Sequence, residues 1–337
     1  MRSNQVTIKD IARELGISPS TVSRALKDHP DISTETKKAV NELAKKLNYQ
    51  PNAIALSLKH SKSFTIGVII PETVHYFFST VISGIEDIAY DAGYNIMICQ
   101  SNELYDREKS NANMLYSNRV DGLLVSLAKE TTDFSHFKSF QANNIPVVCF
   151  DRATSELNCD QIVIDDYAAA FKIVSYLIER GHKNLVHLAA PQHMDIGFNR
   201  RKGFEDALKK HGLPFSDKQV ILADKFEMAA SVVEKLIESG QLPDGIFAVN
   251  DLTALGAMKA LKKHQIKIPE EIGLAGFGNG QNAILTDPPL TTMDQNGYNM
   301  GKKAAEILLK RIINNSNQFI PERHIIDTEL VIRESVR

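Results

Sequence analysis

Tryptophan is absent from the 337-residue sequence, cysteine is scarce, and no run of about 18 apolar residues occurs. Without such a run, the sequence predicts no membrane-spanning helix. The three cysteines, Cys99, Cys149 and Cys159, are odd in number and lack CxxC spacing, which argues against a disulfide framework and a zinc site. The N-terminal stretch is charged where a secretion signal would be apolar. These absences predict a cytoplasmic protein that holds no metal.

The net charge of −2 conceals an uneven distribution along the chain. Residues 1–62 hold 11 basic and 6 acidic side chains, whereas the remainder holds 28 basic and 35 acidic ones. A basic head on an acidic body predicts that only the head meets a polyanion such as DNA, although a segment of this charge is also common by chance. The length is sufficient for two or three domains.

Residues 7–26 carry the pattern of two short helices joined by a tight turn. Apolar residues recur at helical spacing over 8–15, and Gly16 ends this helix. Ser18 can cap a second helix, with Pro19 in its first position. A helix, a glycine-containing turn and a second helix form a helix-turn-helix, and the alternative is an ordinary pair of capped helices.

The second helix opens with small and polar residues, as the part of a recognition helix that enters the major groove must. Arg24 can bond to a guanine edge through two N–H groups. Ser18, Thr21 and Ser23 can contact phosphates and so set the register on DNA. Residues 51–59 are a candidate for a further short helix.

From residue 64 the pattern changes to apolar runs that alternate with amphipathic helical stretches. The expected strands are 64–71, 94–101, 120–127, 145–151, 161–165, 184–190, 245–251 and 272–278. Apolar strands separated by helices predict parallel sheets that are covered on both faces. Eight strands exceed one comfortable sheet, so the predicted fold class is α/β, with an all-α head and two doubly wound lobes.

Several motifs in a fixed order carry a family resemblance. They are TIKDIARELGISPSTVSRAL in the head, and NRVDGLLV, IERGHKNLVHL, RRKGF, AVNDLTALGAM and PPLTTMDQ in the body. With these motifs the chain resembles the LacI/GalR family of transcription regulators over nearly its whole length. The resemblance implies a helix-turn-helix head, a hinge, and an effector domain like that of type I periplasmic binding proteins. The implied divisions are 1–50 for the head, 51–63 for the hinge helix and linker, 64–162 with 291–322 for the first lobe, and 163–290 with 323–337 for the second.

The resemblance also implies roles in DNA binding. Pro19, Ser20 and Arg24 fall where family members read bases in the major groove, and Pro19 would offer an apolar contact. Leu58 matches the family's hinge leucine, which in dimeric relatives wedges into a minor-groove step and kinks the DNA. The alternative for Leu58 is a core residue of a short helix. The expected DNA-binding residues are Thr7, Ser18, Pro19, Ser20, Thr21, Ser23, Arg24, Leu58 and Lys59.

Polar and aromatic residues near strand ends predict the effector site, because ligands of open α/β sheets bind beyond the carboxyl ends of the strands. Arg200 stands before xxGF, as the family's ligand arginine does. The expected effector contacts are Phe77, Phe78, Asp151, Asp165, Asp195, Arg200, Asp251 and Asn279. Each of them could instead be a strand-end cap or an inter-lobe ion pair. Aromatic faces together with carboxylates and an arginine suit a polyhydroxylated ligand.

Two departures from the family pattern bear on the ligand. Gly278 stands where many relatives carry an aspartate, and only Asn279 follows it. Met194 stands where purine-binding relatives carry an arginine. Both departures weaken a purine and favour a sugar or sugar derivative, with a non-sugar metabolite such as a nucleobase as the alternative.

The function so implied is a sequence-specific DNA-binding regulator, expected to be a repressor, whose affinity for a palindromic operator is controlled by a small molecule. A two-fold dimer accounts for the palindrome, and no cofactor is expected. An exported sugar-binding protein would share the body but would need a signal peptide and no head. An enzyme is the other rival, but GFGNG at 276–280 lacks GxGxxG spacing and GYNMGKK at 297–303 departs from a phosphate loop.

Overall fold

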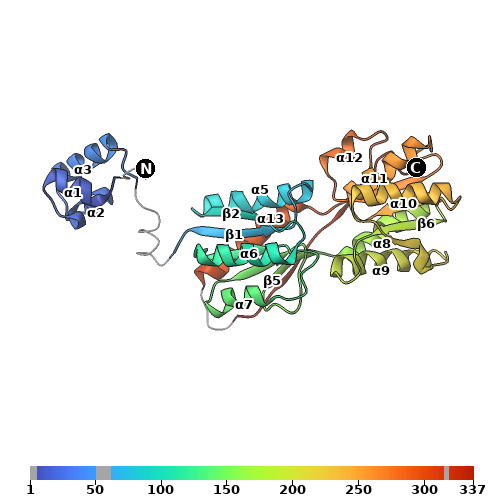
Figure 1. The fold of residues 1–337 in the computed structure, drawn as a ribbon, viewed down its shortest axis with the longest axis horizontal. Coiled ribbons are helices and arrows are strands. Elements are labelled where there is room, and N and C mark those ends of the chain that lie inside the picture. The colour runs from blue at the N-terminus through green and yellow to red at the C-terminus, as the bar shows by residue number, and fades with distance from the viewer. Residues whose placement is uncertain (1–5, 51–61, 315–318) are drawn as a thin grey trace. The chain divides into compact units, whose positions relative to one another are not determined.

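The computed structural model describes residues 6–50, 62–314 and 319–337, and the chain divides into two compact units, Met1–Phe64 and Thr65–Arg337 (Figure 1). Among the described residues, no helix combines the length and the apolar composition that crossing a bilayer needs. The predicted hinge helix, with Leu58 and Lys59, lies outside the described residues.

The described part of the first unit contains three helices, α1 (Ile8–Leu15), α2 (Pro19–Leu26) and α3 (Thr34–Lys46). Their apolar faces meet in one core around Ile11, Val22 and Val40, which are fully buried. Gly16 follows α1 with a φ of 64°, a left-handed conformation that glycine adopts without steric cost. The predicted helix, turn and second helix are therefore confirmed.

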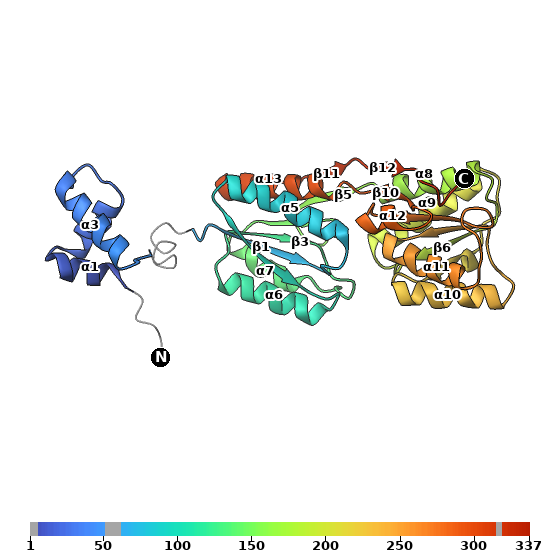
Figure 2. The ribbon, with the colours of Figure 1, turned by 90° about the horizontal axis from the view of Figure 1, so that it is seen from above.

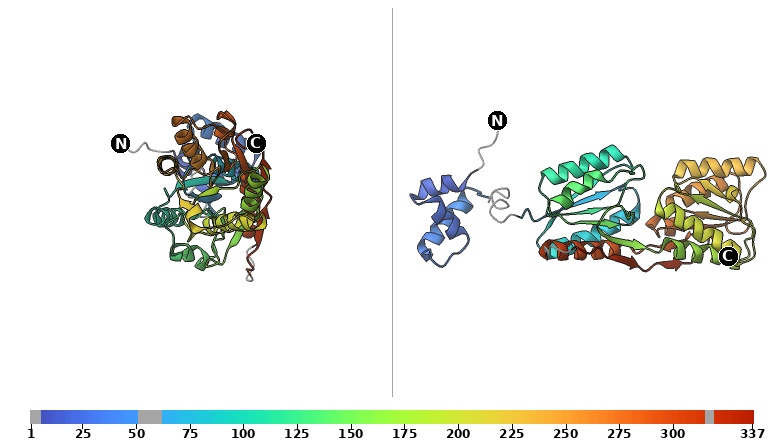
Figure 3. Two further views of the ribbon diagram at one scale, coloured as in Figure 1. Left: turned by 90° about the vertical axis from the view of Figure 1, so that its right-hand side faces the viewer. Right: turned by 90° about the horizontal axis from the view of Figure 1, so that it is seen from below.

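The second unit consists of two lobes, each built on a six-stranded sheet. The first sheet has the order β11-β5-β4-β3-β1-β2, and all its strand pairs are parallel. Its strands are β1 (Thr65–Ile70), β2 (Asn95–Gln100), β3 (Gly122–Val125), β4 (Val147–Phe150), β5 (Asp160–Ile164) and β11 (Arg323–Ile326). Its helices are α5 (Tyr76–Asp91), α6 (Tyr105–Ser117), α7 (Ser135–Ala142) and α13 (Gly297–Ile313). In the right-hand view of Figure 3, α6 and α7 in green and α13 in red lie on opposite faces of this sheet.

The second sheet has the order β12-β10-β9-β8-β6-β7, and only β12 runs antiparallel to its described neighbour. Its strands are β6 (Leu185–Ala189), β7 (Val220–Leu222), β8 (Gly245–Ala248), β9 (Gly273–Phe277), β10 (Thr291–Asp294) and β12 (Glu329–Val331). Its helices are α8 (Asp166–Glu179), α9 (Asp195–Lys210), α10 (Phe226–Glu238), α11 (Asp251–Lys263) and α12 (Gln281–Leu285), with a 3-10 turn at Asp217–Gln219. This layering is the predicted α/β class with two doubly wound lobes.

The predicted lobe boundaries are wrong at three strands. All of β5 belongs to the first sheet, although the prediction divides it after residue 162. β10 belongs to the second sheet and β11 to the first, the reverse of the prediction. The reason is that the chain crosses between the lobes three times, after β5, after β10 and after β11. Figure 2 shows α13, β11 and β12 along the side of the unit where these crossings lie.

Two glycines allow α5 and α13 to pack closely in the first lobe. A Cβ atom added to Gly84 would overlap the Tyr298 carbonyl oxygen, and one added to Gly301 would overlap the Val81 carbonyl oxygen. Because both obstacles are backbone atoms, a larger residue at either position would force the helices apart. This contact fixes α5, whose first turn carries Phe77 and Phe78.

Candidate functional site

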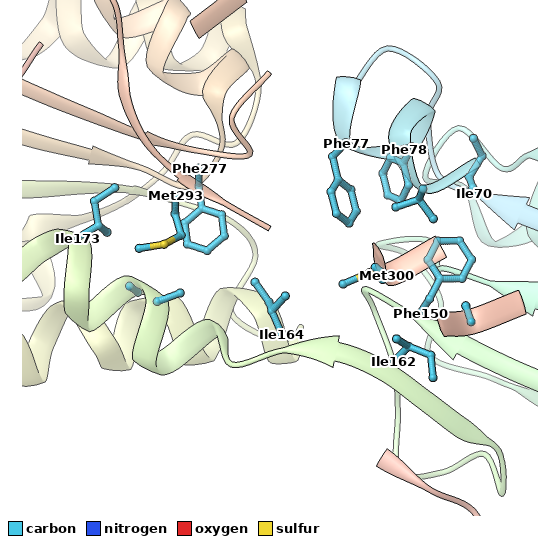
Figure 4. Close-up of a cluster of buried hydrophobic side chains, with 14 of the residues drawn as sticks. Ile70, Phe77, Phe78, Phe150, Ile162, Ile164, Ile173, Phe277, Met293 and Met300 are labelled. Carbon is cyan, nitrogen blue, oxygen red and sulfur yellow. The ribbon is translucent and has the colours of Figure 1, made fainter. Parts of the chain in front are cut away.

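A cavity of about 350 Å³ lies between the two lobes, at the ends of their strands. The first turn of α5 supplies Phe77 and Phe78, whose rings lie 5.2 Å apart and edge to face. Phe277, at the end of β9, lines the cavity from the second lobe. Figure 4 shows Phe77 and Phe78 on one side of this space and Phe277 on the other. Of the predicted effector contacts, the cavity wall includes Phe77, Phe78, Asp151, Arg200 and Asp251.

Arg200 is the most constrained cation on the cavity wall, with 4% of its surface exposed. Its Nε donates to Asp166 Oδ1 at 2.7 Å, Nη1 to the Val249 carbonyl at 2.6 Å, and Nη2 to Gln295 Oε1 at 3.2 Å. Its guanidinium lies 3.6 Å from the centre of the Phe277 ring, a cation–π contact. Since a guanidinium has five N–H groups, one on each Nη remains for a ligand.

Asp151 follows β4 and reaches the cavity from the first lobe. It has a φ of 60°, and its Oδ2 accepts a hydrogen bond from Ser126 Oγ at 3.3 Å. Burial raises the pKa of Asp151 to about 6, and Arg152 beside it opposes this increase. The carboxyl is therefore charged at neutral pH but takes up a proton in mild acid.

Asp251 begins α11 and lies on the cavity wall, but its oxygens already have partners. Oδ2 accepts from the Gly280 N–H at 2.7 Å, and Oδ1 accepts from Thr292 Oγ1 at 2.6 Å. A Cβ atom at Gly276 would collide with Oδ1 of Asp251. Gly278 has a φ of 135°, a conformation that residues with a side chain rarely adopt. Both positions next to this carboxylate therefore favour glycine. Asp251 thus ties α11 to the turn after β9.

Sequence reasoning missed one polar cluster on the cavity wall. Lys129 Nζ lies 2.7 Å from Asp224 Oδ2 and 3.4 Å from Glu103 Oε1. Glu103 also accepts two hydrogen bonds from Arg152, at 2.6 and 3.0 Å. Asp224 follows the three-residue strand β7, which is too short to give a periodic signal, whereas Glu103 and Lys129 lie in loops after strands that the sequence does predict.

Three predicted contacts do not line this cavity. Asp165 and Asp195 line an adjoining cavity of about 540 Å³. Asp165 caps α8 by accepting the Ala168 N–H at 2.8 Å. Asn279 lines neither cavity, because its side chain bonds to Asp294 and Arg333 within the second lobe. Asn279 therefore lies apart from the predicted contacts that line the cavity.

Of the predicted DNA-binding residues that the structure describes, Ser18 to Arg24 lie at the cap and along α2, and Thr7 precedes α1. Ser18 Oγ accepts the Thr21 N–H at 3.1 Å and lies 2.7 Å from Ser20 Oγ. Pro19 and Arg24 are exposed, whereas Thr21 and Ser23 are partly buried. Thr7 stands at the N-cap position of α1, where its N–H and hydroxyl both donate to Asp10 Oδ2 in a capping box. Ser18 thus caps α2, and Arg24 in the last turn remains a long, exposed donor.

The described residues contain no group of three or more His, Cys, Asp and Glu side chains arranged to hold a metal ion. Cys99, Cys149 and Cys159 are buried free thiols, and none is disulfide-bonded.

Known proteins match both units of the chain. Residues 7–52 match the model for bacterial regulatory proteins of the lacI family, and residues 63–334 match that for periplasmic binding proteins and the sugar binding domain of the LacI family. The HTH-type transcriptional repressor PurR of Vibrio atlanticus (strain LGP32) is 33% identical over 98% of both chains.

Solved structures share the fold. The lac repressor dimer bound to operator and the anti-inducer ONPF has a TM-score of 0.85 and 22% identity, and the match covers 98% of this chain and 99% of that one. A LacI family transcriptional regulator from Enterococcus faecium with bound ribose has a TM-score of 0.70 and 25% identity, covering 81% of this chain and 98% of that one.

A helix-turn-helix unit followed by a two-lobed unit with a cavity between its lobes defines a class, the ligand-binding transcription regulators. The chain belongs to the LacI family of bacterial regulatory proteins, which confirms the predicted resemblance. It is a DNA-binding repressor with a ligand-binding domain.

Proposed function

We propose that this repressor responds to an uncharged, polyhydroxylated molecule, a sugar or sugar derivative, that binds in the 350 Å³ cavity between the lobes and changes operator affinity. The observation that carries the proposal is the charge balance of the cavity wall. Lys129 pairs with Asp224, Arg152 with Glu103, and Arg200 with Asp166. Since each of these cations already has a carboxylate partner, the cavity favours a neutral ligand over a phosphate or a carboxylate.

The shape and the hydrogen-bonding groups of the cavity support a sugar in particular. Phe77 and Phe78 offer apolar surface to the C–H groups of a ring, while Asp151 and the free N–H groups of Arg200 can bond to its hydroxyls. The Enterococcus faecium relative with bound ribose is consistent with this ligand class.

On the DNA side, we assign base reading to α2, with Arg24 in its last turn as the side chain that bonds to a guanine edge. Ser18, Ser20 and Thr21 then lie where phosphate oxygens would pass, with Pro19 offering apolar contact. A homodimer on a palindromic operator follows from the two-fold symmetry expected of such repressors.

A ligand screen on the full-length protein tests this proposal. Thermal unfolding is followed with neutral monosaccharides, disaccharides, sugar alcohols, nucleosides and free nucleobases, each at millimolar concentration. A ligand present at 100 times its Kd adds roughly 2.7 kcal/mol to the free energy of unfolding, which raises Tm measurably. A rise with a sugar that is lost in Arg200→Ala supports the proposal. A rise with a nucleobase and with no sugar would contradict it.

A further inference from the structure

Lys129 makes two polar contacts across the cleft between the lobes. It lies in the loop after β3 of the first lobe, and its Nζ pairs with Asp224 of the second lobe at 2.7 Å. Its carbonyl oxygen also lies 2.9 Å from Nε2 of His193, which precedes α9 in the second lobe. Among the ion pairs between described residues, Lys129–Asp224 is the one that joins the two lobes.

The first lobe holds Lys129 firmly in place. The Lys129 N–H donates to Glu103 Oε2 at 3.0 Å, and Glu103 is itself bound by Arg152. The preceding Ala128 N–H donates to the buried Glu108 at 2.6 Å. These bonds fix the backbone from which the Lys129 side chain reaches the second lobe.

The position of this ion pair relates it to the ligand cavity. Lys129 and Asp224 both line the 350 Å³ cavity, and Lys129 also lines the adjoining 540 Å³ cavity. Both side chains are largely removed from solvent, at 18% and 8% exposed. An ion pair so placed is only weakly screened by salt.

We propose that the Lys129–Asp224 pair is a latch that holds the two lobes in the arrangement of this structure. The latch concerns the regulation of the same cavity and to that extent rests on the proposed function, but it acts without ligand or DNA. A ligand that bonds to either side chain would compete with the latch, so cavity occupancy and lobe arrangement are linked.

The two partners do not contribute equally. Asp224→Asn leaves Lys129 with Glu103 at 3.4 Å as a second partner. Lys129→Met removes the ammonium that bonds to Asp224 and leaves a buried carboxylate with only the more distant charge of Arg152. Lys129→Met is therefore expected to open the cleft more than Asp224→Asn does.

Hydrogen exchange with mass spectrometry on the ligand-free, full-length protein tests the latch. Lys129→Met should speed exchange in the second lobe, in segments 190–196 and 220–226, by about tenfold, the effect expected for losing a hydrogen bond to a charged group. Asp224→Asn should speed exchange in segment 126–131 of the first lobe. Exchange in the double variant should be only slightly faster than in the single variant with the larger effect, because both substitutions remove the same interaction.

A matched control pair lies within one lobe. Arg201 and Asp217 form an exposed ion pair at 2.6 Å in the second lobe, and Arg201→Met or Asp217→Asn should leave the three segments unchanged. The latch would be overturned if each substitution changed the exchange rate only in its own lobe. It would also be overturned if the effects of Lys129→Met and Asp224→Asn were additive in the double variant. Lys129→Arg, which keeps the charge, should retain most of the protection.

A distance measurement separates opening of the lobes from local loosening. Figure 2 shows α6 and α10 on the side of the unit opposite the crossings, where opening moves the lobes furthest apart. Spin labels at Met114→Cys and Lys235→Cys should report a longer or broader distance distribution in Lys129→Met than in the otherwise unsubstituted labelled protein. An identical distribution would overturn the latch. Neither measurement uses a sugar, so a failed ligand screen with a positive exchange result would reject the proposed ligand and keep the latch.

Discussion

Arg200 connects several elements of the second lobe that are far apart in the sequence. It joins Asp166 at the start of α8, the carbonyl of Val249 after β8, and Gln295 after β10, and it stacks on Phe277. A ligand that bonds to the two remaining N–H groups of this buried arginine can therefore affect all of these elements.

Arg200→Ala should abolish the effector response and leave operator affinity in the absence of effector within a few-fold of wild type. It should also lower the free energy of unfolding by roughly 3–5 kcal/mol, because Asp166 is left as an unpaired buried carboxylate. Fluorescence anisotropy with labelled operator and urea unfolding measure the two effects. Arg201→Ala, at the next position of α9 and outside the cavity wall, is the control, and a full response in Arg200→Ala would contradict the assignment.

The raised pKa of Asp151 predicts two pH effects. The ordinary pKa of aspartate is 3.8 and the folded value is about 6, so the protonated form is favoured by folding. The stability that this carboxyl contributes is present below pH 3.8 and is lost as the pH rises through 6. Between pH 4 and pH 7, the free energy of unfolding of wild type should fall by roughly 2.4 kcal/mol relative to Asp151→Asn, as measured by urea unfolding of both proteins.

Effector affinity should show the opposite dependence on pH. The charged carboxylate is the better acceptor for ligand hydroxyls, so affinity should fall as the pH drops below about 6. Calorimetric titration with the sugar found in the screen measures this, and Asp151→Asn should remove the dependence. A wild-type dependence that persists unchanged in Asp151→Asn would assign it to another group.

The residues that the sequence could identify are those attached to a long motif or a strong strand. Phe77, Phe78, Asp151, Arg200 and Asp251 all follow predicted strands, and all line the cavity. Asn279 also follows a predicted strand, but its partners Asp294 and Arg333 come from distant parts of the sequence. Periodicity contains no information on such long-range hydrogen bonds.

At the scale of elements, α2 combines a capped start with an exposed arginine in its last turn. Pro19 at the first position and the Ser18 cap fix where the helix begins, and with it the direction in which Arg24 projects. Arg24→Ala should cost about 1–3 kcal/mol on the operator and relax selectivity at one base pair of each half-site.

Competition binding with operators substituted at single positions measures this loss. Arg13→Ala, on the exposed face of α1 where it pairs with Asp10, is the control and should not alter base preference. If Arg24→Ala weakened operator and random DNA by the same factor, Arg24 would contact phosphate rather than a base.

Element prediction succeeded where burial gives a strong pattern. The eight predicted strands and the two helices predicted within residues 7–26 are all present, because continuous apolar runs and cap residues mark them. The sequence did not define β7, β10, β11 or β12 individually. These strands have three or four residues, and several of their side chains are exposed, so no apolar run marks them.

At the scale of the whole molecule, exposed apolar side chains support the proposed dimer. Ile98 on β2 and Ile284 and Leu285 on α12 are exposed, Leu285 to 80%. Figure 1 shows β2, α5 and α12 on the same side of the two-lobed unit. Exposed apolar groups on one side of both lobes are typical of an interface between copies.

Leu285→Glu should therefore convert the dimer to a monomer at micromolar concentration and weaken operator binding by more than tenfold, since one head alone reads half a palindrome. Analytical ultracentrifugation measures the association state. Ile325→Glu, at an exposed position on β11, is the matched control and should leave the dimer intact. A Leu285→Glu protein that stays dimeric would place the interface elsewhere.

The most direct test of the central claim selects DNA rather than ligand. Fragmented genomic DNA from the source organism is incubated with the purified, full-length protein, with and without a metabolite extract, and the retained fragments are sequenced. A ligand-controlled LacI-family repressor predicts one enriched palindrome whose enrichment changes when the extract is added, with sugar-uptake or sugar-degradation genes beside it. No enriched sequence under either condition would contradict the assignment of the head as a reader of DNA and, with it, the account of the whole chain.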